Sequence, residues 1–446
     1  MAQSNAAAAA VQNLFKTPEL KDKILFTLLC LLVYRIGAAV TSPGINPSAI
    51  ADFMNQQKNS GGLLGLYNLF TGGQLARATV FALGIMPYIS ASIFQQIAQA
   101  VVPQIDKMSK DEEGRKKINQ WSRYATLGLA AVQGWGFAIF AESIPGAVTT
   151  PGFAFRMSMT FFLTTGAIFV MWLGEQITER GIGNGASLMI FFSIVERIWP
   201  GIIASFGFMS TGVVGPFSFV VLIIVMVAVV AAVVAVTMAA RRVLIQIPQR
   251  TMARGRMREA SRSFIPLRIN SSGVMPIVFA QSVIVVPGAF GQFSSAQWAK
   301  DLADMMAPGS KLYYVAMAIL ILFFTYFYTS IIFNPVDLAE NLKKQGGFIP
   351  GVKPGAKTAE YIDDVVSKIT LPGAIFLTLV ALLPIWILTA INVPFNFGGT
   401  SLLIVVGVAL DTIQQMNQHL LLRKYDGFMK KGRIRSRGRM GTPGGF

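Results

Sequence analysis

The stretch Phe81-Ala-Leu-Gly-Ile-Met-Pro-Tyr-Ile-Ser-Ala-Ser-Ile-Phe-Gln-Gln96 decides how the rest of the chain is interpreted. It has the length and apolar character of a membrane span, but Gly84 and Pro87 interrupt it and four polar side chains crowd its second half: Ser90, Ser92, Gln95 and Gln96. Lipid cannot satisfy polar groups, and each unpaired one costs several kcal/mol. We therefore expect this helix to face protein or a watery path rather than acyl chains alone.

A second apolar piece comes just before it, Gly61-Gly-Leu-Leu-Gly-Leu-Tyr-Asn-Leu-Phe-Thr-Gly-Gly73. Glycines lie at both ends, and the piece is too short to cross about 30 Å of hydrocarbon. A half-length element followed by a broken, polar span predicts a re-entrant segment beside a conduit. The alternative is an ordinary external loop, which would expose Leu63, Leu64, Leu66, Leu69 and Phe70 to water.

The composition agrees with a membrane protein. The chain has 446 residues, of which 53% are hydrophobic and 13% are charged, whereas soluble domains carry about 25% charged residues. The single cysteine, Cys30, excludes an internal disulfide and a cysteine-based metal cluster. The single histidine, His419, is more typical of an interfacial residue than of a base. No acid pair and no Cys/His or Ser/His arrangement indicates catalysis, so we predict neither an enzyme nor a cofactor.

Ten apolar stretches are candidate spans. They lie near residues 24–40, 76–102, 122–141, 153–174, 185–206, 217–240, 273–291, 313–334, 371–391 and 401–422. Basic residues concentrate in segments 103–123 and 241–270 and in the tail after 422, while the intervening loops carry almost none. Positive charge marks the cytosolic side, so an even number of spans places both termini in the cytosol.

Four blocks of sequence resemble the bacterial SecY family, the channel subunit of the general protein-secretion translocon. They are Ala82-Leu-Gly-Ile-Met-Pro-Tyr-Ile-Ser-Ala-Ser92, Trp172-Leu-Gly-Glu-Gln-Ile-Thr-Glu-Arg-Gly-Ile-Gly-Asn-Gly185, Asn341-Leu-Lys-Lys-Gln-Gly-Gly-Phe-Ile-Pro-Gly351 and Pro394-Phe-Asn-Phe-Gly-Gly-Thr-Ser-Leu-Leu-Ile404. The likeness runs from about Lys16 to Tyr425. It implies a protein-conducting channel that passes unfolded secretory chains across the membrane and releases hydrophobic segments sideways into lipid.

The resemblance also implies the architecture: an all-α membrane protein with ten transmembrane helices in two pseudo-symmetric five-helix halves and a re-entrant plug. The halves are residues 24–206, which include the plug at 61–73, and residues 217–422, which include cytosolic loops 241–272 and 335–370. An external hinge loop at 207–216 joins them. Residues 1–23 form a cytosolic N-terminal segment, and residues 423–446 form a basic cytosolic tail.

Site residues are carried over from the family position by position. A ring of apolar side chains forms the narrowest point: Ile85, Ile89, Ala186, Ile190, Val278 and Ile404. The plug includes Gly61, Leu63, Leu64, Leu66, Tyr67, Asn68, Leu69, Phe70 and Gly72. A ring of this kind gates by dewetting, because ions do not shed water cheaply in a gap lined with hydrocarbon. Ala186 and Val278 are smaller than the family's usual residues, which predicts a wider ring that leans more on the plug.

A lateral gate to lipid lies between the second and seventh helices, with polar positions Ser90, Gln96, Gln133 and Asn270. Interhelical hydrogen bonds average about 0.6 kcal/mol in membranes, so a few would latch the gate by about 1–2 kcal/mol. A signal peptide's apolar residues offer about 3–6 kcal/mol on meeting lipid. We expect these two terms to be comparable, so that a hydrophobic signal opens the gate.

The large cytosolic loops resemble docking sites for the ribosome and the motor protein SecA, through Arg250, Arg254, Arg256, Arg258 and Lys353. Dense arginine suits phosphate-rich RNA, whereas Lys353 stands where the family typically carries arginine. The alternative is an ordinary solvated loop. The resemblance further implies SecE and SecG subunits, signal peptides, nascent chains and membrane lipids as partners, and the bacterial inner membrane as the location.

Two other classes of protein remain possible on sequence alone. A secondary transporter of a small solute also has broken helices and paired halves, and a scaffold would leave the plug and ring unexplained. The intramembrane charges Arg35 and Asp411 admit a proton relay, although structural pairing or snorkelling fits better. Gly181–Gly185 and Gly346–Gly351 imitate nucleotide loops, but the first follows a membrane helix and Val352 stands where the second needs lysine.

Overall fold

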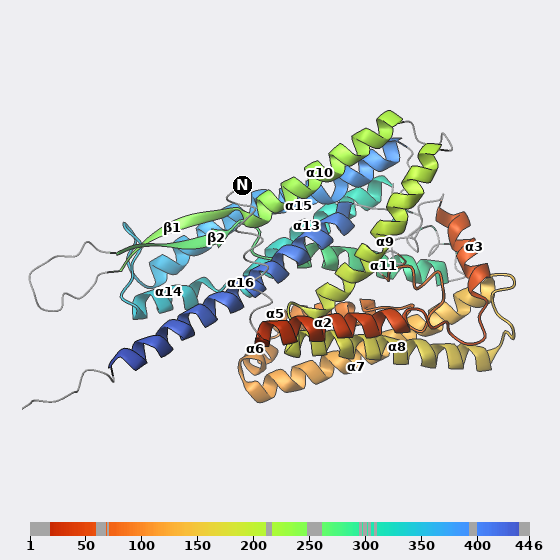
Figure 1. The fold of residues 1–446 in the computed structure, drawn as a ribbon, viewed down its shortest axis with the longest axis horizontal. Helices are drawn as coiled ribbons and strands as arrows, with labels where there is room; N and C mark the ends of the chain where they lie inside the picture. Colours follow the sequence, from red (N-terminus) through yellow and green to blue (C-terminus); the bar gives the residue numbers. More distant parts are fainter. Residues whose placement is uncertain are drawn as a thin grey trace, which may run out of the picture.

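The computed structural model describes residues 18–58, 68, 71–210, 216–247, 261–293, 297, 301, 305–306, 310–391 and 399–436. Within this part of the chain, long helices make up most of the structure and one two-stranded sheet stands at one end (Figure 1). The helices are α2 (Pro18–Gly37), α3 (Pro47–Lys58), α5 (Met86–Val101), α6 (Pro103–Lys110), α7 (Glu112–Ser143), α8 (Phe153–Arg180), α9 (Gly185–Ser210), α10 (Pro216–Met238), α11 (Met275–Phe293), α13 (Lys311–Ile332), α14 (Pro335–Lys344), α15 (Ala356–Ile391) and α16 (Gly399–Ser436). The strands are β1 (Ala240–Ile247) and β2 (Ser261–Arg268).

Each of the ten predicted spans overlaps one helix: α2, α5, α7, α8, α9, α10, α11, α13, α15 and α16. Among the described residues, five helical stretches are long and apolar enough to cross a bilayer by themselves, and they lie on α7, α8, α10, α13 with α14, and α15. The predicted span at 76–102 is wrong at its start, because helix α5 begins only at Met86. Turns occupy the residues before it, and Gly84 has a left-handed φ of 56° that a helix does not allow.

The helices pack as two groups in chain order (Figure 1). Before residue 210, α7 packs against α5 and α8, and α8 packs against α2 and α9. After residue 216, α13 packs against α11 and α15, while α10, α15 and α16 pack against one another. The groups meet where α9 contacts α16 and where α11 contacts α5 and α7. Because the two groups meet along two seams, side chains from both groups come together at the centre of the molecule.

Apolar packing at this centre forms one continuous cluster that runs through both groups. Small residues let the backbones approach closely, as at Gly185, where an added Cβ would lie 1.9 Å from the Gly174 carbonyl oxygen. Helix α2 packs on the cluster with one face, and its other face is exposed. Five apolar residues on it are each more than half exposed: Leu25, Leu28, Leu29, Leu32 and Ile36. A helix that is apolar on its outer face suits a hydrocarbon surrounding rather than water.

Strands β1 and β2, helix α14 and the first turns of α15 form a separate body, which we call the hairpin unit. β1 and β2 pair antiparallel, and Gln246 extends the pairing through two backbone hydrogen bonds to Phe348, of 2.9 and 3.0 Å. A second apolar cluster fills the unit: Val243, Ile245, Leu267, Leu342, Ile349, Ile362, Val365 and Ile369. The two segments that the sequence presents as independent loops, 241–272 and 335–370, are therefore joined through one core.

Local signals fix the ends of the elements in this unit. The Asn334 side chain accepts hydrogen bonds from the backbone N–H groups of Val336 and Asp337, at 3.1 and 3.5 Å, and Pro335 occupies the first position of α14. The segment predicted as a cytosolic loop, 335–370, thus contains helix α14 and the beginning of α15. Helix α16 continues to Ser436, into the segment predicted as the basic tail.

Candidate functional site: an apolar ring, a plug stem and a polar network

The six predicted ring residues come from both helix groups. Ile85 lies directly before α5, Ile89 lies on α5, Ala186 and Ile190 lie on α9, Val278 lies on α11 and Ile404 lies on α16. Five of them belong to the buried central cluster and are at most 6% exposed, and Ala186 packs against that cluster while partly buried. The ring residues therefore lie in apolar surroundings, as dewetting requires.

Gly174 supports the ring from α8. A Cβ added to Gly174 would lie 3.3 Å from the Ile85 side chain and 3.7 Å from the Ala186 backbone nitrogen. Ile85 and Ala186 therefore approach the same small residue, although they are far apart in the sequence. The small side chain of Ala186 adds no bulk at this point, and it is the only ring residue that is not fully buried.

Most of the predicted plug lies outside the described residues, namely Gly61, Leu63, Leu64, Leu66, Tyr67, Leu69 and Phe70. The described remainder of the plug is residues 68 and 71–73; together with the next residue, Gln74, it is called the plug stem here. Asn68 is 3% exposed, and its side-chain oxygen accepts from the Ala76 backbone N–H at 3.1 Å. Gly72 and Gly73 have φ values of 68° and 86°, which glycine adopts without strain. The described part of the stem is thus buried, and further turns separate it from the start of α5 at Met86.

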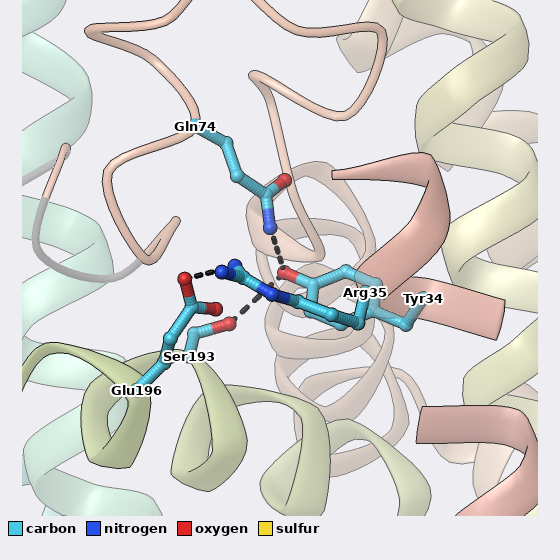
Figure 2. Close-up of polar contacts among 5 residues, drawn as sticks. All are labelled: Tyr34, Arg35, Gln74, Ser193 and Glu196. Atoms are coloured by element: carbon cyan, nitrogen blue, oxygen red, sulfur yellow. Dashed lines mark hydrogen bonds and ion pairs between the residues drawn. The ribbon is translucent and has the colours of Figure 1, made fainter. Parts of the chain in front are cut away.

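Polar side chains of α2 and α9 surround the stem. Tyr34 of α2 forms a hydrogen bond of 2.9 Å with Ser193 of α9, and Gln74 of the stem donates to the Tyr34 hydroxyl at 2.7 Å (Figure 2). Beside them Arg35 forms an ion pair with Glu196 (Figure 2). Arg35 is therefore paired, in agreement with the structural pairing that the sequence analysis favoured over a proton relay. The network joins three segments that are distant in the sequence.

The predicted gate residues do not hydrogen-bond across the gate as expected. The Asn270 amide donates to the Gly273 carbonyl at 3.0 Å and its oxygen accepts from Ser272 at 3.2 Å, so its bonds stay within one turn before α11. The side-chain oxygens of Gln96 and Gln133 are buried without a hydrogen-bond partner among the described residues. Ser90 is buried at 6% exposure. The helices that carry these residues are nevertheless neighbours, because α11 packs against α5 and α7.

Comparison with known proteins decides the family. The family model described as SecY matches residues 79–413, which is more than half of the chain. The chain belongs to the SecY family. It is 42% identical over 429 residues to the protein translocase subunit SecY of Aquifex aeolicus, covering 94% of this chain and 99% of that one.

Solved structures agree with this fold. One is a SecY protein whose plug domain is described as stabilising the closed state of the translocation channel and maintaining a membrane seal, with a TM-score of 0.63 at 17% identity, covering 89% of this chain and 92% of that one. Another is Sec61 in the canine ribosome–channel complex from the endoplasmic reticulum, with a TM-score of 0.60 at 16% identity and the same coverage. At these identities the likeness concerns the fold alone.

The predicted docking residues of this SecY-family chain are only partly described. Arg250, Arg254, Arg256 and Arg258 lie outside the described residues, between β1 and β2. Lys353 is exposed in the turn between α14 and α15, and its carbonyl accepts from the Thr358 hydroxyl at 2.9 Å. The hairpin unit therefore presents Lys353 on a surface that its own core holds in place.

Sequence reasoning missed five residues of the polar contacts around the stem: Tyr34, Gln74, Ser193, Glu196 and Arg197, which donates to the Asn68 carbonyl. The available signal was the charged pair Glu196–Arg197 inside the candidate span 185–206, since charges are rare in spans and mark functional or paired positions. The partners of these two charges were not readable, because Glu196 pairs with Arg35, 161 residues away, and Arg197 donates to Asn68, 129 residues away.

Proposed function

We propose that this SecY-family chain is the channel subunit of a protein translocase and conducts unfolded polypeptides across the membrane. The observation that carries the proposal is the apolar ring, whose six residues come from both helix groups: five lie in the buried central cluster and Ala186 packs against it. Such a ring closes around a passing chain of any sequence through flexible apolar side chains, and it excludes ions when empty.

The remaining parts of the proposal follow from the same family. Segment 61–73 acts as a plug below the ring, and the seam between α11 and α5 opens sideways to release hydrophobic segments into lipid. The two helix groups are the two halves that part, and both termini lie in the cytosol of a bacterium whose inner membrane holds the chain. SecE and SecG complete the complex, and the hairpin unit receives SecA or the ribosome.

A small-solute transporter is the rival function. Transporters place polar groups at the membrane midplane to bind ions and substrate, whereas the six ring positions here are aliphatic. The aliphatic ring therefore favours the channel.

The deciding experiment uses vesicles that contain the chain expressed with SecE and SecG. With SecA, ATP and a preprotein supplied outside, we expect the preprotein to become protected from protease inside the vesicles. A nascent chain arrested in transit should crosslink to a photoreactive group at Ile190, and a group at the exposed Ile413 should serve as the control. Solute uptake without any preprotein export would contradict the channel and support the transporter.

A further inference from the structure

The guanidinium group of Arg197, on helix α9, forms a hydrogen bond with the plug stem. Arg197 donates to the Asn68 backbone carbonyl at 3.2 Å, and the same oxygen accepts from the Gly73 backbone N–H at 2.8 Å and from the Thr71 hydroxyl at 3.3 Å. Arg197 and Asn68 are 129 residues apart. Arg197 of α9 therefore adds a third hydrogen bond to the carbonyl oxygen of Asn68, which already accepts two within the stem.

A second set of contacts begins at Gln74, the residue that follows Gly73. Gln74, Tyr34 and Ser193 form a chain of hydrogen bonds, and their exposed fractions are 3%, 2% and 1% (Figure 2). Hydrogen bonds in such dry surroundings lose little to competing water, and breaking one leaves a buried polar group unsatisfied. The stem is thus tied to α9 directly through Arg197 and indirectly through α2.

The backbone of the stem also fits closely against α9. A Cβ added to Gly72 would lie 3.2 Å from the Ser193 Cβ atom and 3.3 Å from the Ser193 carbonyl oxygen. At Gly73 it would lie 3.4 Å from the Arg197 guanidinium. Two glycines therefore let the stem lie flat on the two residues of α9 that hold it.

The same face of α9 carries part of the ring. Ile190 precedes Ser193 by three residues and Arg197 by seven, and these spacings place all three on one side of a helix. The ion pair of Arg35 with Glu196 ties this part of α9 to α2. A movement of α9 that widens the ring at Ile190 must therefore disturb the contacts of Ser193 and Arg197 with the stem.

We propose that Arg197, Ser193, Tyr34 and Gln74 are positioning residues that hold the plug stem against α9 in the idle channel and release it when α9 moves. This inference rests on the proposed function, because it assigns the stem to a plug. It couples the two seals: a polypeptide that pushes Ile190 outward also loosens the grip on the stem.

The first test changes the guanidinium. The complex with Arg197→Leu, in a planar bilayer without preprotein, should conduct ions at least about tenfold more than the parent, because a hydrogen bond from a charged donor is lost. Arg197→Lys keeps a charged donor and should restore most of the seal. Arg180→Leu removes an exposed arginine at the end of α8 and serves as the matched control. Equal idle conductance for the parent and Arg197→Leu would overturn the proposal.

The second test locks the stem in place, and it decides the matter even if Arg197→Leu fails to accumulate. In a Cys30→Ala background, Gly72→Cys with Ser193→Cys places two Cβ atoms 3.2 Å apart, slightly inside the roughly 3.5–4.5 Å of a disulfide, so the positive φ at position 72 must relax as the bond closes. Oxidation should stop preprotein export and reduction should restore it, with the Ser193→Cys single variant insensitive to both. Export that continues through the crosslinked channel would refute release of the stem. Failure of the Cys30→Ala parent to export any preprotein would instead count against the proposed function.

Discussion

Charge inside a membrane segment is tolerated when a partner stands beside it, and α2 and α9 illustrate the rule. An unpaired arginine or glutamate costs about 2.5–3.5 kcal/mol at the centre of a span on insertion scales. Arg35 pairs with Glu196, and the neighbouring Arg197 donates to a carbonyl. The two charged residues of α9 thus bind other segments of the chain. From the sequence of the span alone, only the free-energy cost of inserting them is visible.

The ring provides the first prediction at the residue scale. Ile190→Asn places an amide at a position that is 3% exposed, which costs about 1–3 kcal/mol when the amide finds no partner. We expect the idle ring to admit water and the ion conductance without preprotein to rise severalfold. Ile413→Asn changes an isoleucine that is 51% exposed on α16 and should leave the conductance unchanged. A parent-like conductance for Ile190→Asn would argue that Ile190 lies outside the seal.

The second prediction at the residue scale concerns Glu142, near the connection between α7 and α8. Arg156 donates to Glu142 at 2.8 Å and the Gly152 backbone N–H donates at 2.9 Å, and both hold the pKa of the Glu142 carboxyl below its ordinary value. A lowered folded-state pKa contributes stability above the unfolded-state pKa of about 4.3, and that stability is lost as the pH falls below this value. In detergent, the melting temperature should therefore fall more steeply between about pH 5 and about pH 3 for the parent than for Glu142→Gln, because this pH range lies on both sides of the unfolded-state pKa. Parallel curves would contradict the pairing.

At the scale of elements, the hairpin unit has a core of its own. Ile362 is 1% exposed within it, so Ile362→Ala should destabilise the unit by about 2–5 kcal/mol through lost burial and the remaining cavity. Cleavage by added protease between β1 and β2 should become faster, while the membrane helices stay protected. Tyr361→Ala changes the adjacent residue, which is 37% exposed, and should cleave like the parent. Loss of the whole chain from the membrane would show that the unit is not independent.

The surface of the same unit carries the docking prediction. Lys353→Glu reverses a charge that is exposed and has no ion pair among the described residues, so we expect the fold to stay intact and SecA-dependent export to stop. Lys353→Arg should be tolerated, because it keeps the charge and adds the planar fork that binds carboxylates. Preprotein protection in vesicles measures both variants. Normal export by Lys353→Glu would remove Lys353 from the docking site.

For the whole molecule, the seam between the two helix groups decides how easily the channel opens. Gln96 and Gln133 carry buried side-chain oxygens without a hydrogen-bond partner in the described part of the chain. A buried unsatisfied group costs about 1–3 kcal/mol, and water that enters between the helices on opening would relieve that cost, whereas lipid would not. We therefore propose that the two glutamines favour a hydrated opening, whereas the sequence predicted that they latch the gate.

Replacing Gln96 with leucine tests this reversal. Gln96→Leu removes the unsatisfied oxygen from the closed state, so we expect a more stable closed state and roughly tenfold weaker export of preproteins with marginally hydrophobic signals, since about 1.4 kcal/mol corresponds to a factor of ten. Strongly hydrophobic signals, which gain about 3–6 kcal/mol in lipid, should export normally. Asn270→Leu should weaken the turn before α11 instead, because the bonds of Asn270 stay within that turn. Improved export by Gln96→Leu would restore the latch interpretation.

The sequence by itself determined the membrane class, the ten apolar stretches that overlap helices and the family resemblance, because these depend on composition and on local runs of residues. It also identified Phe81–Gln96 as a broken span, although only the structure decided that α5 begins at Met86. The hairpin, the shared core of the hairpin unit and the Arg35–Glu196 and Arg197–Asn68 contacts were decided by the tertiary structure alone. Each of these joins segments separated by many residues, and such pairings arise only when the folded chain brings two polar or two apolar surfaces into contact where neither water nor lipid can replace the partner.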